Sequence, residues 1–425
     1  MRGAAARRSR ARHARPGGAG LALLLALALL SGCGARDRAE GRISGRTLRI
    51  YLSGPLTGAS SLSARAAIAG AEMALADAGR RMGRYRIALA VLNDATAQAG
   101  GWDPGQTNLN AHRAAQDPAA IGYIGDFDSG ASAVSIPVLN RAGIPQVSPA
   151  SGAVGLTSSA PGASPGEPGK YYPTGRRTFV RVVPSYAVEA SAEVGLQQRL
   201  GCRASLVLQD GEVDGEDAAI SYVLAAQAAG LRVLAVQSYE RRAADYTSLA
   251  RAVAQSGADC VLLDAADERS AARVAGRVGQ AAPAARIFAS SALADPAFAD
   301  PAMGGISRAL DPRVFVLSPG LGPLYPPAGQ RFLARYARLF GPPPPQAIFG
   351  YEAMSLMLAA IDAATDHGRR PAVRGQVIEH LLGARRRHTV LGSYVIGRDG
   401  ETSIESYGVW RLSAGRLHFW QEARG

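Results

Sequence analysis

The chain has 425 residues, of which 47% are hydrophobic, and 47 Lys and Arg against 34 Asp and Glu give a formal charge of +13. This apolar share excludes a disordered chain, and the length suits two or three domains with sizeable cores. The basic residues are spread along the chain without the sustained block typical of nucleic-acid tails, so we expect no nucleic-acid partner.

The first element is a targeting segment. Six arginines and no acid precede an apolar run at 21–30, which ends in Ser31, Gly32 and Cys33. This order is typical of a secretory signal, and a cysteine after Leu-Ser-Gly resembles the bacterial lipobox, in which that cysteine is lipidated. A transmembrane anchor is the alternative, but the run is shorter than the roughly 20 apolar residues that span a bilayer. We therefore predict a signal peptide over 1–32 and an extracytoplasmic protein anchored to the cell membrane through Cys33.

Residues 33–46 are polar and lack periodicity, which predicts a tether between the lipid and the folded body. Removing the signal lowers the formal charge to +7, because it carries six arginines. With Cys33 assigned to the lipid, two cysteines remain, Cys202 and Cys260. In an oxidising compartment they form either a disulfide or two separate buried thiols.

Beyond the tether, strands and helices alternate up to a long loop at 149–178 that is rich in Gly, Ser and Pro. The predicted strands are 47–52, 85–92, 121–124 and 146–148, and the predicted helices are 64–78, 108–116 and 131–142. Such alternation predicts βαβ units and parallel sheets.

The alternation resumes after the loop. The predicted strands are 204–209, 232–237, 259–264 and 286–289, the helices are 216–229, 246–255, 268–278 and 352–364, and three last strands are 393–396, 407–412 and 417–421. Cys202 precedes the first strand of this half and Cys260 lies at the start of the third. These strands are neighbours in the usual doubly wound order, which favours a disulfide.

Several short pieces of the first half carry a resemblance to a known family. They are Ser53-Gly54-Pro55, followed by 70–74, 125–132 and 143–151. In this order and spacing they resemble the type I periplasmic binding proteins, in particular the branched-chain amino-acid (Leu/Ile/Val) receptors of ABC importers.

The resemblance implies an α/β fold of two Rossmann-like lobes with parallel sheets, joined by a three-crossover hinge. Lobe 1 would hold residues 47–184 and 318–390. Lobe 2 would hold residues 185–317 and 391–425. A solute would lie in the cleft, and the lobes would close over it by hinge motion.

The strand ends predict where a ligand binds, because ligands lie beyond the carboxyl ends of strands in open α/β sheets. Ser129 and Gly130 lie between strand 121–124 and the helix predicted from residue 131, so the Ser129 hydroxyl and the free N–H groups at that helix N-terminus could hold a carboxylate. An ordinary N-cap is the alternative for Ser129. The carbonyl groups of 148–152, after the next strand, could accept hydrogen bonds from an ammonium group.

The resemblance implies the rest of the site. Ser129 matches the family's ligand serine, and Ala150 matches a position that offers a backbone carbonyl. Gly152 replaces the usual Thr or Ser, for which Ser151 could substitute. The candidate ligand-binding residues are Ser129, Gly130, Ala150, Ser151, Gly152, Asp214 and Ser291.

Lobe 2 departs from the family pattern. Asp214 falls near a position that is often aromatic, and Ser291 falls near one that often carries the ammonium-binding Glu. In lobe 1, Asp126 and Asp128 flank Ser129. If both face the cleft, they would repel a carboxylate and favour a cationic or polyhydroxyl ligand; otherwise they are solvated loop acids.

No motif indicates catalysis. The six histidines lack metal-binding spacing, and neither a GxSxG elbow nor a Walker A motif is present. We predict a monomeric binding protein with no cofactor and no metal, which captures a small polar solute such as an amino acid and delivers it to ABC permease subunits. The alternatives are a ligand-sensing lipoprotein of the same fold without a transport role, and a degenerate lipoprotein that binds nothing.

Overall fold

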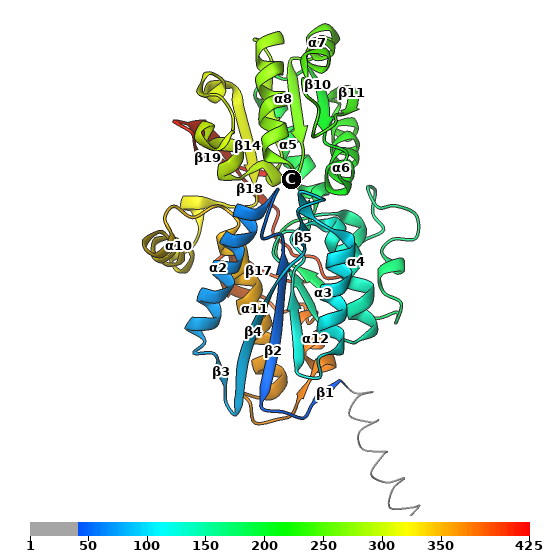
Figure 1. The fold of residues 1–425 in the computed structure, drawn as a ribbon, viewed down its shortest axis with the longest axis vertical. Helices are drawn as coiled ribbons and strands as arrows, with labels where there is room; N and C mark the ends of the chain where they lie inside the picture. The colour runs from blue at the N-terminus through cyan, green and yellow to red at the C-terminus, as the bar shows by residue number, and fades with distance from the viewer. Residues whose placement is uncertain (1–40) are drawn as a thin grey trace, which may run out of the picture.

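The computed structural model describes residues 41–425, so the signal peptide, Cys33 and residues 34–40 lie outside the described part. The chain forms two α/β lobes that follow one another along the long axis of the molecule (Figure 1), each built on its own sheet. The C-terminus lies between them.

Lobe 1 contains a six-stranded sheet in the order β3-β4-β2-β7-β8-β9. Its strands are β2 (Thr47–Gly54), β3 (Arg81–Met82), β4 (Tyr85–Asn93), β7 (Ala120–Ile124), β8 (Gln146–Ser148) and β9 (Phe179–Arg181). All neighbouring pairs are parallel except β3 with β4. The predicted parallel sheet of βαβ units is therefore confirmed for this lobe.

Alternation along β2 explains how helices cover both faces of this sheet. Leu48, Ile50 and Leu52 belong to one core cluster, together with residues of α2 and α11. Tyr51 points the other way, into a cluster with residues of α3 and α4. The helices of lobe 1 are α2 (Ser61–Asp77), α3 (Pro104–Gln116), α4 (Ser129–Arg141), α10 (Pro327–Phe340), α11 (Ala347–Thr365) and α12 (Arg374–Leu381).

Helices α2 and α11 approach closely at two glycines. A Cβ atom at Gly70 would lie 2.0 Å from the Ala347 carbonyl oxygen, and one at Gly350 would lie 1.8 Å from the Ala67 oxygen. Any side chain there would push the helices apart. By length and composition α11 could cross a membrane, but most of it is buried inside lobe 1, so it is a core helix.

Lobe 2 contains a seven-stranded sheet in the order β11-β10-β12-β13-β14-β18-β19. Its strands are β10 (Ala204–Gln209), β11 (Arg232–Ser238), β12 (Cys260–Asp264), β13 (Arg286–Ala289), β14 (Val314–Ser318), β18 (Ser406–Ser413) and β19 (Arg416–Arg424). Its helices are α5 (Tyr186–Arg199), α6 (Val213–Ala229), α7 (Thr247–Ser256), α8 (Glu268–Ala281) and α9 (Pro296–Ala299). Leu206 and Leu208 pack with α7 and α8, whereas Val207 packs with α5 and α6 on the opposite face.

The tether is shorter than predicted. β1 (Arg42–Ile43) pairs antiparallel with β15 (Ala372–Val373), and Ile43 is buried in the core of lobe 1. The prediction of a tether is therefore wrong for residues 41–46, because one buried isoleucine and the two residue pairs between β1 and β15 hold this segment against the lobe.

The third crossover lies later than the predicted boundary at 391. Leu391, Tyr394 and Ile396 all belong to the core of lobe 1, next to the hairpin of β16 (Arg387–Thr389) and β17 (Gly392–Tyr394). The assignment of 391–396 to lobe 2 is wrong, since the chain enters the lobe 2 sheet only at β18.

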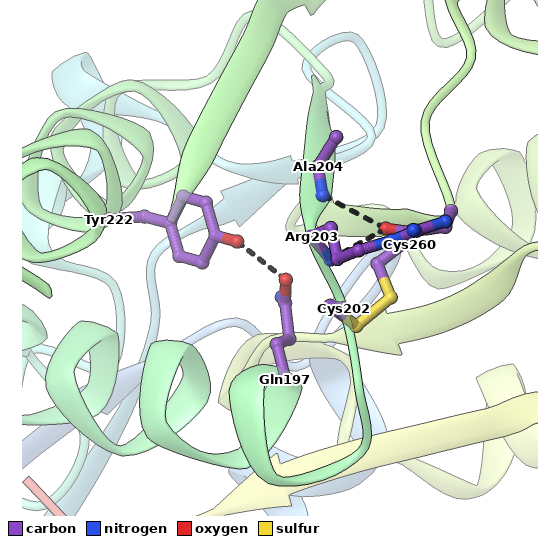
Figure 2. Close-up of a disulfide and its surroundings, with 7 residues drawn as sticks. Gln197, Cys202, Arg203, Ala204, Tyr222 and Cys260 are labelled. Atoms are coloured by element: carbon purple, nitrogen blue, oxygen red, sulfur yellow. Dashed lines mark hydrogen bonds and ion pairs between the residues drawn. A yellow bond between two sulfur atoms is a disulfide. The ribbon is translucent and has the colours of Figure 1, made fainter. Parts of the chain in front are cut away.

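The two cysteines form a disulfide, as the strand order predicted. Cys202 precedes β10 and Cys260 opens β12; these strands are parallel neighbours, and the two Cα atoms lie 5.9 Å apart (Figure 2). Beside the bond, Asp259 accepts hydrogen bonds from the backbone N–H groups of Arg203 and Ala204. The disulfide thus joins the amino ends of the strands, the edge of the sheet opposite their carboxyl ends.

Candidate ligand-binding site

A small cavity of about 60 Å³ lies between the lobes. It lies where parallel strands of both sheets end, the location predicted from the fold class. Loops after β7 and β8 supply part of its lobe 1 wall, beside Ser60 and the start of α11, and loops after β10, β12 and β13 supply much of its lobe 2 wall. Its lining includes Phe127, Asp128, Ala150, Tyr186, Asp214 and Ser291.

The N-terminus of α4 holds the carboxylate of Asp214, which opens α6 in lobe 2. Oδ1 accepts hydrogen bonds from the Ser129 N–H at 2.9 Å and the Tyr186 hydroxyl at 2.7 Å. Oδ2 accepts from the N–H groups of Ser129 at 3.1 Å and Gly130 at 3.4 Å. Free N–H groups and the helix dipole attract an anion to such a position. The position predicted for a ligand carboxylate is therefore filled by a side chain of the protein itself.

The Ser129 side chain is buried behind Asp214 and does not line the cavity. Its Oγ accepts the N–H groups of Gly152 and Ala153, each at 3.1 Å, and lies 3.3 Å from the Tyr186 hydroxyl. Because Tyr186 donates its proton to Asp214, the Ser129 hydroxyl donates to Tyr186 in turn. This chain of bonds joins α4, the loop after β8 and α5.

The Tyr186 ring explains the glycine at position 152. A Cβ atom at Gly152 would lie 2.4 Å from the ring, so any larger residue would displace it. Ser151 does not replace the lost hydroxyl in the cavity, since its Oγ bonds to the Ser132 hydroxyl and to the carbonyl oxygens of Asp126 and Asp128. Tyr186 was not identified as a site residue from the sequence. Its position at the start of α5, where the chain first passes from lobe 1 to lobe 2, could have indicated that it lies at the cleft.

Ser291 lines the cavity but both of its donors are used. Its N–H and hydroxyl donate to the Glu189 carboxylate at 2.6 and 2.7 Å. Burial raises the pKa of Glu189, and the two bonds from Ser291 oppose that rise. The sequence did not single out Glu189, which lies three residues after Tyr186 in α5. The Glu189 carboxylate thus lies directly behind Ser291 and does not itself line the cavity.

Of the two aspartates that flank Ser129, only Asp128 lines the cavity. Asp126 is fully buried, accepts a hydrogen bond from the Tyr123 hydroxyl at 3.0 Å and does not line the cavity. Asp128 lines it, and its Oδ2 is buried without a hydrogen-bond partner. Neither is a solvated loop acid. Burial raises the pKa of Asp128 well above its usual range, and the charge of Asp214 raises it further.

Arg181, a fully buried residue of β9, supports the loop that carries Gly152 and Ala153. Its Nη1 donates to the carbonyl oxygens of Ser151 at 3.2 Å and Ala153 at 2.7 Å, and its Nε donates to Glu401 at 3.0 Å. The loop therefore presents its N–H groups to Ser129 from a rigid base.

A family model described as periplasmic binding protein matches residues 47–411. The chain belongs to this family. Periplasmic binding proteins are extracytoplasmic proteins that bind solutes, so the predictions of a binding protein rather than an enzyme, and of an extracytoplasmic location, are confirmed. The resemblance stated from the sequence is also confirmed.

Solved structures share the fold of this binding protein at low sequence identity. The leucine-binding protein LivK of Thermotoga maritima is 17% identical with a TM-score of 0.75, the match covering 89% of this chain and 99% of that one. LivJ of Streptococcus pneumoniae, solved with isoleucine, is 13% identical with a TM-score of 0.74, covering 89% and 100%. A solute-binding protein of Rhodopseudomonas palustris, solved with p-hydroxybenzoic acid, is 14% identical with a TM-score of 0.73, covering 89% and 97%. No curated protein matches the chain.

Proposed function

We propose that this binding protein is the solute receptor of an ABC importer, held at the membrane by lipidated Cys33 and acting as a monomer. The observation that carries the proposal is a cavity between two lobes, at the carboxyl ends of the strands of both, whose largely apolar wall carries a few polar side chains such as Asp128, Asp214 and Ser291. Loops from separate strands converge there, which suits capture of a small polar solute and its release when the lobes part.

The structural neighbours bind solutes of two kinds, a branched-chain amino acid and a hydroxybenzoic acid. Both ligands carry a carboxylate. In this chain the N-terminus of α4, the position predicted for a ligand carboxylate, holds Asp214, so we do not carry the branched-chain specificity over. The solute is proposed to be an amino acid or a related small polar compound.

Native mass spectrometry of the mature protein, purified under non-denaturing conditions from its host, tests the solute role. We expect a bound small molecule, and deletion of the gene should abolish uptake of that compound. A ligand-free spectrum, together with no thermal stabilisation by any solute of a broad panel, would exclude a receptor role.

Membrane fractionation tests the anchor. The wild-type protein should sediment with the membranes, and Cys33→Ser should move it to the soluble extracytoplasmic fraction. Equal sedimentation of both would refute lipidation at Cys33.

A further inference from the structure

The charge lining the cavity is negative. Asp128 and Asp214 are its charged lining residues, and no basic side chain of the described residues lines it. A second cavity of about 300 Å³ adjoins it and shares Ser60, Asp128 and Ala266 with it. Asp128 thus lies at the junction of the two cavities.

Asp214 occupies the hydrogen-bond donors at the N-terminus of α4 that a ligand carboxylate would need. The N–H groups of Ser129 and Gly130 and the Tyr186 hydroxyl all donate to it, and the N–H groups of Gly152 and Ala153 donate to Ser129 Oγ. A solute carboxylate would have to displace Asp214 or lie against it, and like charges at such range repel.

Asp128 is a partly unused acceptor. It is the N-cap residue of α4, where an aspartate commonly accepts a backbone N–H of the first turn, yet its side chain makes no such bond. The residue is 9% exposed, and its Oδ2 has no hydrogen-bond partner. A buried carboxylate oxygen without a donor is costly, and a cation in the cavity would supply the donor.

The adjoining cavity offers a surface for the body of such a cation. Trp102 lines it and packs over Gly130, where a Cβ atom would lie 2.5 Å from the ring. Indole rings attract ammonium groups through cation–π contact. Arg241, the basic residue of this cavity, is paired with Glu212 at 2.5 Å and does not reverse the negative charge.

We propose that the solute is a primary amine without a carboxylate, whose ammonium group donates to Asp128 and whose body extends toward Trp102, while Asp214 fills the anion position itself. This inference rests on the proposed solute-binding function. Burial, and after it the charges of Asp214, Asp94 and Glu212, raise the pKa of Asp128, and a bound cation would relieve the repulsion between these acids.

The test uses trios of compounds that share a skeleton and differ in charge. They are ethanolamine, glycine and glycolate; isopentylamine, leucine and 4-methylpentanoate; and benzylamine, phenylglycine and phenylacetate. Isothermal titration calorimetry of the mature protein should show that within at least one trio the amine binds at least tenfold more tightly than the zwitterion and the acid. A zwitterion or acid that binds more tightly than its amine would overturn the inference and leave the receptor function standing.

Matched variants locate the ammonium group. Asp128→Asn should weaken amine binding at least tenfold, whereas Asp300→Asn, which removes the same charge from a helix cap far from the cavity, should not. Asp214→Ala should improve binding of the zwitterion. Unchanged amine binding by Asp128→Asn would overturn the inference.

If none of the nine compounds binds, the solute identified by native mass spectrometry decides. An amine without a carboxylate supports the inference, a carboxylate overturns it, and no solute at all overturns the receptor function as well.

Discussion

Asp295 of lobe 2 accepts a hydrogen bond from the backbone N–H of Ser63, in the first turn of α2 in lobe 1, at 3.0 Å. The Ser63 hydroxyl donates to the same oxygen. Glu268 of lobe 2 accepts the N–H of Ser60, the residue before α2, at 2.8 Å. Since the Ser60 side chain makes no cap bond, the N-terminus of α2 is capped from the other lobe, as the N-terminus of α4 is capped by Asp214. Contact between the lobes therefore supplies hydrogen-bond acceptors to N–H groups at the starts of α2 and α4, and these groups lose those acceptors when the lobes part.

Asp295→Ala should shift the ligand-free protein toward an open form, because the first turn of α2 loses an acceptor that only lobe contact supplies. Small-angle X-ray scattering should show a larger radius of gyration. Asp295 also caps α9 through the Ala297 N–H, a local loss of about 1 kcal/mol. Asp300→Ala is the control, since Asp300 caps the next turn in the same way through Ala302. Equal radii for the two variants would contradict a role for Asp295 in closure.

Glu268 should make stability fall as the pH rises. Burial, and then the charge of Asp295, raise the pKa of Glu268 to about 8 from its ordinary 4.5. Folding therefore favours the protonated form, and the contribution of Glu268 to the free energy of unfolding is fully present below about pH 4.5 and lost as the pH rises through about 8.

Glu268→Gln, which stays neutral and keeps the acceptor for Ser60, should therefore gain stability relative to wild type between pH 5 and pH 9. Urea denaturation at several pH values measures the difference. Glu72→Gln, at an exposed position, removes the same charge as a control. A difference between Glu268→Gln and wild type that stays constant over this range would refute the assignment.

Gly152→Ser should destabilise the protein by about 1–3 kcal/mol, because its Cβ would overlap the Tyr186 ring. In the Tyr186→Ala background the same change should cost much less, giving a coupling energy between the two sites. Tyr186→Phe keeps the ring and should not relieve the clash. Chemical denaturation of the single and double variants supplies the cycle; additive effects would rule out the steric explanation.

Replacing both Cys202 and Cys260 by Ser should lower stability by up to about 4 kcal/mol, the loop-closure value for their sequence separation of 58. Solute affinity should not change, because the bond joins the amino ends of β10 and β12 while the cavity lies at their carboxyl ends. Thermal unfolding and calorimetry test the two parts separately. A large loss of affinity in the folded variant would mean that the disulfide also shapes the cleft.

The doubly wound core could be predicted because its strands are short apolar runs; β8, β10 and β13 have the predicted bounds. Helix α5 could not be recognised, since its buried residues include Glu189, Glu193 and Gln197 among the apolar ones and so blur the apolar pattern. Glu189 is bonded to Ser291 and Gln197 to Tyr222, both from distant segments, so no local pattern signals their burial.

The location of the site could be predicted from the sequence, but the hydrogen bonds between its residues could not. The strand order predicts which edge of the sheets carries the site, and the resemblance to the family points to Ala150, Asp214 and Ser291, which all line the cavity. The bond between Asp214 and the Ser129 N–H joins residues 85 apart in the sequence and in different lobes, and depends on the angle at which the lobes meet. A single sequence carries no signal of that angle.

The pairing of β1 with β15 determines how the molecule would stand on a membrane. This pairing lies at the end of lobe 1 remote from lobe 2 (Figure 1), and the eight steps from Cys33 to Gly41 span at most about 28 Å. With Cys33 lipidated as proposed, lobe 1 would be held close to the lipid surface and lobe 2 would be the lobe that swings. The cleft between the lobes would then lie above the membrane surface, beyond lobe 1. The receptor would have to tilt about its short linker to bring the bound solute to a permease.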